Sequence, residues 1–224
     1  MRLLAIDTSG ETCSAALLCG TELTQILELA PRQHAELILG MMARLLAESG
    51  LTLNALDALA FGRGPGSFTG VRIAAAVIQG AAFGAGLPVI GVSTLAALAQ
   101  GHHRLTAHRC ILAALDARMG EVYWGCYRIA KDGLAQLVGE ELVAPPQKVP
   151  RPCGEGWRGV GSGFGTYAQE MGRVLGPALA GFDPAPSCEA GDIARLAEGA
   201  WHRGQGFAPE LALPVYLRDR VTAR

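Results

Sequence analysis

The chain has 224 residues, of which 50% are apolar and 17% charged, and its 19 basic and 20 acidic side chains give a net charge of −1. This balance excludes a disordered chain, which has few apolar residues and many charges, and it excludes binding of nucleic acid through a strong overall positive field. The length suits one large domain or two small ones.

The first half is predicted to form one α/β unit. Strands at 3–6, 14–18 and 23–29 are separated by polar turns and form an antiparallel meander. Helical spacing of apolar residues predicts a helix over 32–50, where Gly50 suits the C-terminal position. A strand, a loop, a helix, a strand and a short helix follow, at 56–61, 62–70, 71–85, 89–92 and 93–100. This order is typical of a ribonuclease H-like unit, with a mixed five-stranded sheet flanked by helices.

The second half is predicted to repeat this scheme in degenerate form. When the sequence is aligned with itself so that Asp116 pairs with Asp7, strands are predicted again at 112–115, 122–127 and 134–138. Four prolines between positions 145 and 152 break any helix there, and a helix is predicted to resume only at 193–201. We therefore expect two ribonuclease H-like lobes of the actin-like ATPase class, at 1–101 and, incomplete, at 102–224.

The tip of the first hairpin has residue types that a phosphate and metal turn needs. Asp7, Thr8, Ser9 and Gly10 supply a carboxylate for hydrated Mg²⁺ and hydroxyl and N–H groups for phosphate oxygens. An ordinary polar turn, in which Asp and Ser bond their own backbone, explains the same residues, so both interpretations stay open. The corresponding turn at 116–120 has Arg and Met where a phosphate cradle needs glycines, which argues against a two-sided grip on ATP.

The loop Gly62–Gly70 holds four glycines and a proline between a strand and a helix. Such a loop can present backbone N–H groups to an anion at the start of the helix, although it lacks the lysine of a P-loop. A rigid, close-packed turn is the other interpretation. The histidines show no metal-ligand spacing, so no metal site is predicted, and the stretch His102–Arg109 is predicted to be a solvated loop.

The helix at 71–85 has no polar face beyond Arg72 and Gln79. Because a helix on the outside of a sheet normally has such a face, we predict that this helix is covered twice, by its own sheet and by a partner. The alternative is that the two helices of this half bury each other. The predicted partner face takes residues from both helices: Leu37, Met41, Arg44, Leu45, Val71, Ala74, Ala75, Ile78 and Ala82.

Three features predict a cytoplasmic protein without a membrane span. The six cysteines show no CxxC and no regular spacing, which indicates reduced thiols. The apolar run at 3–6 is too short for a signal peptide. The uncharged segment from 73 to 101 is interrupted by Gly84, Gly86 and Pro88 after about fifteen residues, short of the roughly 20 that a spanning helix needs.

Several motifs resemble the bacterial TsaB family, also called YeaZ-type. The stretch Pro65–Ile73 is the most specific of them, and the resemblance covers almost the whole chain. Ala74 and Gln79 depart from the family, which more often has Gly and Lys there, and this difference affects helix packing. The further motifs are at Ile6–Ser9, Arg32–Glu36, Leu87–Leu95, Asp116–Arg118, Glu121–Tyr123 and Pro214–Arg218.

The resemblance implies a non-catalytic subunit of the complex that forms N6-threonylcarbamoyladenosine at position 37 of ANN-decoding tRNAs. Such a subunit binds and activates the transferase paralogue TsaD through the helical pair, together with the ATPase TsaE. It forms a homodimer when alone and meets tRNA only through the complex. The resemblance implies no cofactor of its own, and places any ATP at the subunit interface.

Thr94 and Leu98 stand where TsaD-type proteins have metal-binding histidines, so we expect neither a metal site nor catalytic residues. Two other functions stay open beside the binding subunit. One is an actin-like, ATP-dependent enzyme that uses Asp7–Gly10. The other is a protease that acts on its partner, for which no recognisable nucleophile and base are present.

Overall fold

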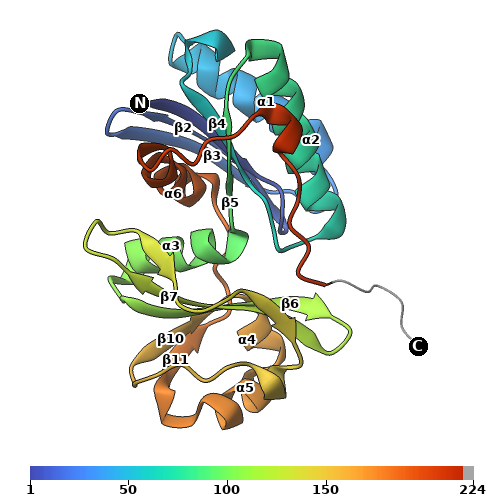
Figure 1. The fold of residues 1–224 in the computed structure, drawn as a ribbon. Helices are drawn as coiled ribbons and strands as arrows, with labels where there is room; N and C mark the ends of the chain where they lie inside the picture. The colour runs from blue at the N-terminus through green and yellow to red at the C-terminus, as the bar shows by residue number, and fades with distance from the viewer. Residues whose placement is uncertain (219–224) are drawn as a thin grey trace. The chain divides into compact units, whose positions relative to one another are not determined.

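The computed structural model describes residues 1–218, which form two compact units (Figure 1). Unit 1 joins residues 1–97 to residues 187–214, and unit 2 holds residues 98–186 with residues 215–218. The predicted division at 101/102 differs from these units, because a C-terminal segment of the chain returns to the first sheet.

Unit 1 is built on a mixed five-stranded sheet with the order β3-β2-β1-β4-β5. The antiparallel meander places Asp7 opposite Ser14, and β4 and β5 then add parallel strands on the other side of β1. Strand β4 is buried throughout, as expected for a parallel strand covered on both faces. The strands are β1 (Arg2–Asp7), β2 (Thr12–Cys19), β3 (Glu22–Leu29), β4 (Ala58–Gly62) and β5 (Val89–Val92).

Three helices cover the two faces of this sheet. Helices α1 (His34–Glu48) and α2 (Phe68–Ala85) pack on one face, and α6 (Ala190–His202) packs on the other (Figure 1). The alternation along β2 fits this arrangement: Cys13 belongs to the core under α1 and α2, whereas Ser14 Oγ accepts a hydrogen bond from Ala190 N at 3.0 Å. Helix α6, predicted within the second lobe, therefore supplies the cover that the second face of the first sheet needs.

Unit 2 repeats the strand order of unit 1. Its sheet runs β11-β10-β6-β7-β8, with β6 and β7 antiparallel and β10 and β11 added in parallel, and β9 also pairs with β7. The strands are β6 (Cys110–Arg118), β7 (Glu121–Ile129), β8 (Ala135–Leu137), β9 (Leu142–Ala144), β10 (Trp157–Val160) and β11 (Leu179–Asp183). The α/β fold class with two such sheets, five and six strands flanked by helices, is confirmed.

The helices of unit 2 differ most from the predicted elements. Short helices α4 (Ser162–Thr166) and α5 (Ala168–Leu175) fill a region in which no helix was predicted before 193. Helix α3 (Thr94–Thr106) continues beyond Gln100, so the predicted loop begins only after Thr106. His102 is buried at 4% exposure, because its ring stacks on the ring of His108. Four 3-10 turns complete the elements: η1 (Leu53–Ala55), η2 (Pro146–Lys148), η3 (Gly176–Ala178) and η4 (Pro209–Leu211).

Candidate functional site

Helix α2 is the longest helix of the described residues, and its sequence explains both its ends. It begins at Phe68, three residues before the predicted start, because Ser67 caps it: the Ser67 hydroxyl accepts a hydrogen bond from Gly70 N. It ends before Gly86, which adopts the left-handed conformation that suits glycine. The 18 residues between are mostly alanine and other apolar types.

Most residues of the predicted partner face are buried inside unit 1. Seven of the nine side chains are at most 5% exposed and belong to the core of unit 1 or to the contacts between its helices and its sheet. Leu37 is half-buried, and Arg44 is exposed and pairs with Glu48. The predicted residues thus lie mainly on the stripe that packs on the sheet, where unit 1 itself covers their side chains. The seven buried residues are Met41, Leu45, Val71, Ala74, Ala75, Ile78 and Ala82.

The opposite side of the same two helices carries the exposed apolar surface. Leu39 of α1 is 58% exposed, and Phe68 and Phe83 near the two ends of α2 are 56% and 70% exposed. Small residues lie between these larger side chains: Gly40, Ala43, Ala76 and Gly80. We call this surface, from Leu39 to Phe83 across both helices, the helical face. Its apolar character is unusual for a surface that faces water.

Helix α2 also meets the length and composition of a membrane-spanning helix, alone among the helices of residues 1–218. Only 33% of its residues are buried. Its buried stripe packs on β4 and on α1. Helix α2 is therefore part of the folded core of unit 1, and only its outer side is uncovered.

The turn at Asp7–Gly10 is tied to the glycine loop by a closed set of hydrogen bonds. Asp7 Oδ2 accepts hydrogen bonds from the backbone N and the hydroxyl of Ser9, at 3.1 and 3.0 Å. Thr8 Oγ1 donates to Gly70 O at 2.7 Å, and Ser67 N donates to Ser9 O at 2.8 Å. The N–H of Ser9 and the hydroxyls of Thr8 and Ser9 therefore already have partners within unit 1, as in an ordinary polar turn.

Three glycines of the loop are required by this close packing. A Cβ atom on Gly62 would lie 2.1 Å from Asp7 Oδ1, on Gly66 2.6 Å from Ser9 O, and on Gly70 1.9 Å from Thr8 O. Real Cβ atoms do not approach other atoms so closely. The loop is therefore the rigid, close-packed turn, and its glycines make room for the hairpin tip.

Asp7 is fully buried, and burial raises the pKa of its carboxyl to about 6, although hydrogen bonds from Ser9 and the nearby Cys188 thiol lower it. Its second oxygen, Oδ1, accepts no hydrogen bond from the described residues. The same burial, with the charge of Asp7 beside it, raises the pKa of Cys188 well above its usual range. Both groups are thus biased toward their neutral forms.

The corresponding turn of unit 2 is more open. Asp116 Oδ1 accepts a hydrogen bond from Arg118 N at 2.8 Å, and Arg118 is paired with Asp116 but its side chain is 85% exposed. Arg118, Met119 and Gly120 all have positive φ, which turns the chain between β6 and β7. This turn is built around an exposed Arg and Met, as predicted from its sequence.

The two positions compared with metal-binding histidines have structural roles. Thr94 Oγ1 donates to Pro65 O, and Leu98 is buried at 1% exposure. Within residues 1–218, no group of three or more His, Cys, Asp and Glu side chains is placed to hold a metal ion. All six cysteines, which lie in this part of the chain, are free.

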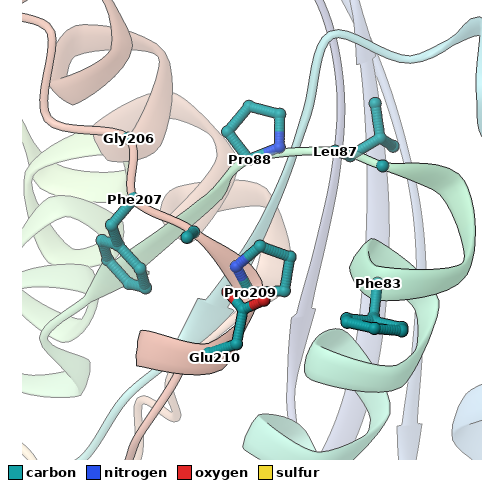
Figure 2. Close-up of a pocket in the computed structure, with 9 residues that line it drawn as sticks. Phe83, Leu87, Pro88, Gly206, Phe207, Pro209 and Glu210 are labelled. Atoms are coloured by element: carbon teal, nitrogen blue, oxygen red, sulfur yellow. The ribbon is translucent and has the colours of Figure 1, made fainter.

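A groove of about 580 Å³ lies at the C-terminal end of α2. No local sequence pattern predicted this groove. The segment after α6 crosses the free edge of β5, where Phe207 and Val89 exchange backbone hydrogen bonds at 3.0 and 2.9 Å. Gln79 Nε2 then donates to Pro209 O at 3.2 Å and holds η4 against α2. Figure 2 shows Phe83 on one side of this groove and Pro209 and Glu210 on the other.

Comparison with known proteins identifies close relatives over the full chain. The family model TsaD, tRNA N6-adenosine threonylcarbamoyltransferase, matches residues 26–156. The tRNA threonylcarbamoyladenosine biosynthesis protein TsaB of Escherichia coli is 43% identical over 99% of this chain and 96% of its own length. The TsaB protein of Haemophilus influenzae is 40% identical over 99% of this chain and 95% of its own.

Two solved structures from Pseudomonas aeruginosa have the same fold. One, described as similar to peptidase YEAZ, is 47% identical with a TM-score of 0.91, over 97% of this chain and 99% of that chain. The other, YeaZ, is 47% identical with a TM-score of 0.90, over 96% of this chain and 99% of that chain. The described fold is thus the fold of these solved relatives.

Proposed function

We propose a function from one premise: the chain belongs to the TsaB family of tRNA threonylcarbamoyladenosine biosynthesis proteins, also called YeaZ-type. It takes part in the formation of this modified nucleoside. Within that pathway it is a non-catalytic subunit that binds and activates a TsaD-type transferase, together with a TsaE-type ATPase. It works in the cytoplasm and contacts tRNA only through the assembled complex.

The helical face carries this proposal. Helix α2 is apolar over 18 residues and only 33% buried, so it leaves an apolar surface that a partner would remove from water. The match of the TsaD family model to residues 26–156, which include both α1 and α2, supports a paralogous partner with a similar helical pair. Two helical pairs with small residues between larger ones can pack closely against each other.

The closed turn at Asp7 supports a subunit without its own nucleotide. Ser9 N and the Thr8 hydroxyl are engaged within unit 1, and the carboxyl of Asp7 is fully buried beneath the glycine loop. A phosphate or hydrated Mg²⁺ at this turn would have to break these bonds and displace the glycine loop. Any ATP in the complex is therefore held chiefly by other subunits.

Light scattering on a sizing column tests the proposal, with the chain alone and mixed with the TsaD-type paralogue from the same source. We expect a mixed complex to form, and Ala76→Asp on the exposed side of α2 to abolish it while the variant stays folded. Arg203→Glu, an exposed change after α6 on the other face of the sheet, serves as the control. Unchanged elution of both proteins after mixing would contradict the proposal.

The ATP-dependent enzyme is the second candidate, motivated by the Asp7–Gly10 turn. It predicts ATP turnover by the isolated chain that Asp7→Ala removes. The binding subunit predicts no turnover by either protein. The peptidase similarity in the description of one solved relative is tested in the same samples, by intact mass of the paralogue after prolonged mixing.

A further inference from the structure

A buried histidine of unit 2 carries a ring nitrogen without a partner. His102 lies on α3 and is 4% exposed, and its Nε2 atom has no hydrogen-bond partner among residues 1–218. The ring of His108 stacks on it, with ring centres 5.4 Å apart. Buried polar atoms of folded proteins are nearly always hydrogen-bonded. This nitrogen therefore points to a polar ligand.

The ring of His102 lies over the start of β10. Helix α3 and β6 are joined by three residues, so the chain reverses between them, and β10 runs parallel to β6. Leu98 of α3 packs just after β10, because a Cβ atom built on Gly161 would lie 2.7 Å from Leu98 Cδ2. Side chains four residues apart share one face of a helix, so His102 faces the same sheet one turn nearer the start of β10.

Arg158 is the side chain of β10 that faces α3 at this place. The neighbouring Gly159 faces the other side of the sheet, because a Cβ atom built on it would lie 2.5 Å from the ring of Phe164. Alternation along the strand then turns Arg158 toward α3. Its guanidinium lies over β11, the outermost strand, since a Cβ atom on Gly181 would lie 2.4 Å from Nη1. Arg158 is half-buried, so its side chain joins the surroundings of His102 to the edge of the sheet.

The charged groups near His102 leave the guanidinium of Arg158 without a partner. Burial lowers the pKa of His102, three neighbouring bases lower it further, and only Asp183 raises it. A backbone N–H group already donates to the carboxylate of Asp183, at 3.0 Å. Within the described part of the chain, Arg158 forms no ion pair and its guanidinium donates no hydrogen bond. The three bases are His108, Arg158 and His103.

We propose that a phosphate group binds at this edge of unit 2, between the guanidinium of Arg158 and Nε2 of His102. The planar guanidinium donates two N–H groups to phosphate oxygens, and Nε2–H of His102 donates to a third oxygen. The phosphate group belongs to a free phosphate compound or to the backbone of RNA, because both offer the same oxygens. The site lies in unit 2, so it does not depend on the helical face of unit 1.

Titration of the full chain with inorganic phosphate tests the proposal, with the histidine ring signals followed by NMR at constant ionic strength. We expect the signals of His102 and His108 to shift to saturation, with a Kd on the order of 1 mM. Arg158→Gln should weaken binding at least about tenfold, and Arg158→Lys should restore part of the loss because it keeps the charge. Arg173→Gln, an exposed change on α5, is the matched control.

A second variant separates lost binding from lost folding. His102→Phe keeps a ring that stacks on His108 but has no N–H group, so it should also weaken phosphate binding while its circular dichroism stays that of the wild type. Three results would overturn the proposal: shifts that do not saturate, equal shifts on addition of chloride, or binding that Arg158→Gln and His102→Phe leave unchanged.

A competition experiment distinguishes the two sources of the phosphate group. A short single-stranded RNA without terminal phosphates is added to the chain saturated with inorganic phosphate. If the RNA displaces the phosphate, and Arg158→Gln weakens its binding as well, the site takes the backbone of RNA. If the phosphate stays bound, the site takes free phosphate or a phosphate monoester.

Discussion

The two units share a strand order but differ in the helices that follow β4 in unit 1 and its counterpart β10 in unit 2. In unit 1, β4 leads through a glycine loop into α2, an uninterrupted helix of 18 residues. In unit 2, β10 leads through a second glycine-containing loop into α4 and α5, helices of five and eight residues. Only a long helix offers a continuous apolar surface. The repeated topology therefore builds both cores, and the length of α2 gives unit 1 the exposed apolar surface that we propose as the partner site.

The first turns of the two units differ in a related way. Asp7 is fully buried under the glycine loop, whereas the side chain of Asp116 is 13% exposed and pairs with an exposed Arg118. Close packing at the first turn fixes the start of α2. The second turn contacts the start of a much shorter helix, because Asp116 N donates to Oγ of Ser162, the first residue of α4, at 3.1 Å.

The largest effect that distinguishes the buried and exposed sides of α2 is expected from Ile78→Asp. Ile78 is fully buried in the core of unit 1, so a carboxylate there loses apolar burial and remains unpaired, at a cost of about 4 kcal/mol or more in the free energy of unfolding. Urea unfolding followed by circular dichroism measures this loss.

Two substitutions at exposed positions test whether partner binding depends on the outer side of α2. Ala76→Asp is expected to lower the free energy of unfolding by less than about 1 kcal/mol, because it lies on the exposed side of α2 and loses mainly helix propensity. Arg173→Glu places a charge change on exposed α5 of unit 2, and paralogue binding should remain unchanged. If Ala76→Asp binds the paralogue as tightly as the wild type, or if Arg173→Glu loses binding, the exposed side of α2 is not the surface that distinguishes unit 1 from unit 2 in partner binding.

Substitution of the glycines in the first turns of α2 and α4 compares the two units directly. In Gly70→Ala the new Cβ meets Thr8 O at 1.9 Å, and we expect a loss of about 3 kcal/mol. In Gly163→Ala of unit 2 the nearest atom, Ala114 Cβ, lies at 2.9 Å, and we expect about 1 kcal/mol. Gly10→Ala meets no atom within 4 Å and is the control. Equal losses at Gly70 and Gly163 in thermal unfolding would show that the starts of the two helices are packed alike.

The sequence predicted the elements of unit 1 well, because each had its own local signal. The alternating strands, the turn at Pro31 and the helix end at Gly50 can each be recognised from a few neighbouring residues. The start of α2 was missed by three residues, because Ser67 and the hairpin tip stabilise its first turn. In unit 2, β10 and β11 are short and carry a weak pattern. The helices α4 and α5 are also short, and they follow a proline-rich stretch in which no helix is predicted.

The candidate site was predicted only in part. The sequence pattern located the two helices that carry the exposed apolar surface, but it could not tell which side packs on the sheet, because α2 is apolar all round. The groove required Phe207 and Pro209 to return from more than 100 positions later, which no local pattern contains. His102 was predicted to lie in a solvated loop, but α3 continues to Thr106 and His102 is buried within it.

The turn at Asp7 predicts a pH effect in unit 1. Burial raises the pKa of Asp7 from 3.8 to about 6, so between these values the folded chain holds a proton that the unfolded chain has released. The free energy of unfolding therefore falls as pH rises through this interval, by about 3 kcal/mol in total. Asp7→Asn should remove this slope and be about 2 kcal/mol more stable than the wild type at pH 8, since the amide leaves one N–H group unpaired.

Urea unfolding of both proteins at pH 5 and pH 8 checks this expectation. The control is Asp57→Asn, an exposed carboxyl whose Oδ2 accepts a hydrogen bond from Arg2 N. Parallel pH profiles for the wild type and Asp7→Asn would mean that folding does not raise the pKa of Asp7.

The smallest expected effect is a pH dependence of the opposite sign in unit 2. Burial lowers the pKa of His102 below 6.5; His108, Arg158 and His103 lower it further, and Asp183 raises it. As pH falls through 6.5, the unfolded chain takes up a proton that the folded chain does not, so stability is lost toward acid. Amide hydrogen exchange of residues 98–106, corrected for intrinsic rates, should then show weaker protection at pH 5.5 than at pH 7.5.

His102→Phe separates this titration from packing, because phenylalanine keeps a ring that can stack on His108 but carries no proton at either pH. We expect the variant to lose the pH dependence of protection in α3 while its protection at pH 7.5 stays near that of the wild type. His202→Phe, an exposed change at the end of α6 in unit 1, should leave the response of α3 intact. The two units would thus respond to pH in opposite directions, each through one buried group at its own turn or helix end. A common response in both units would instead indicate that net charge, and not these two side chains, controls their stability.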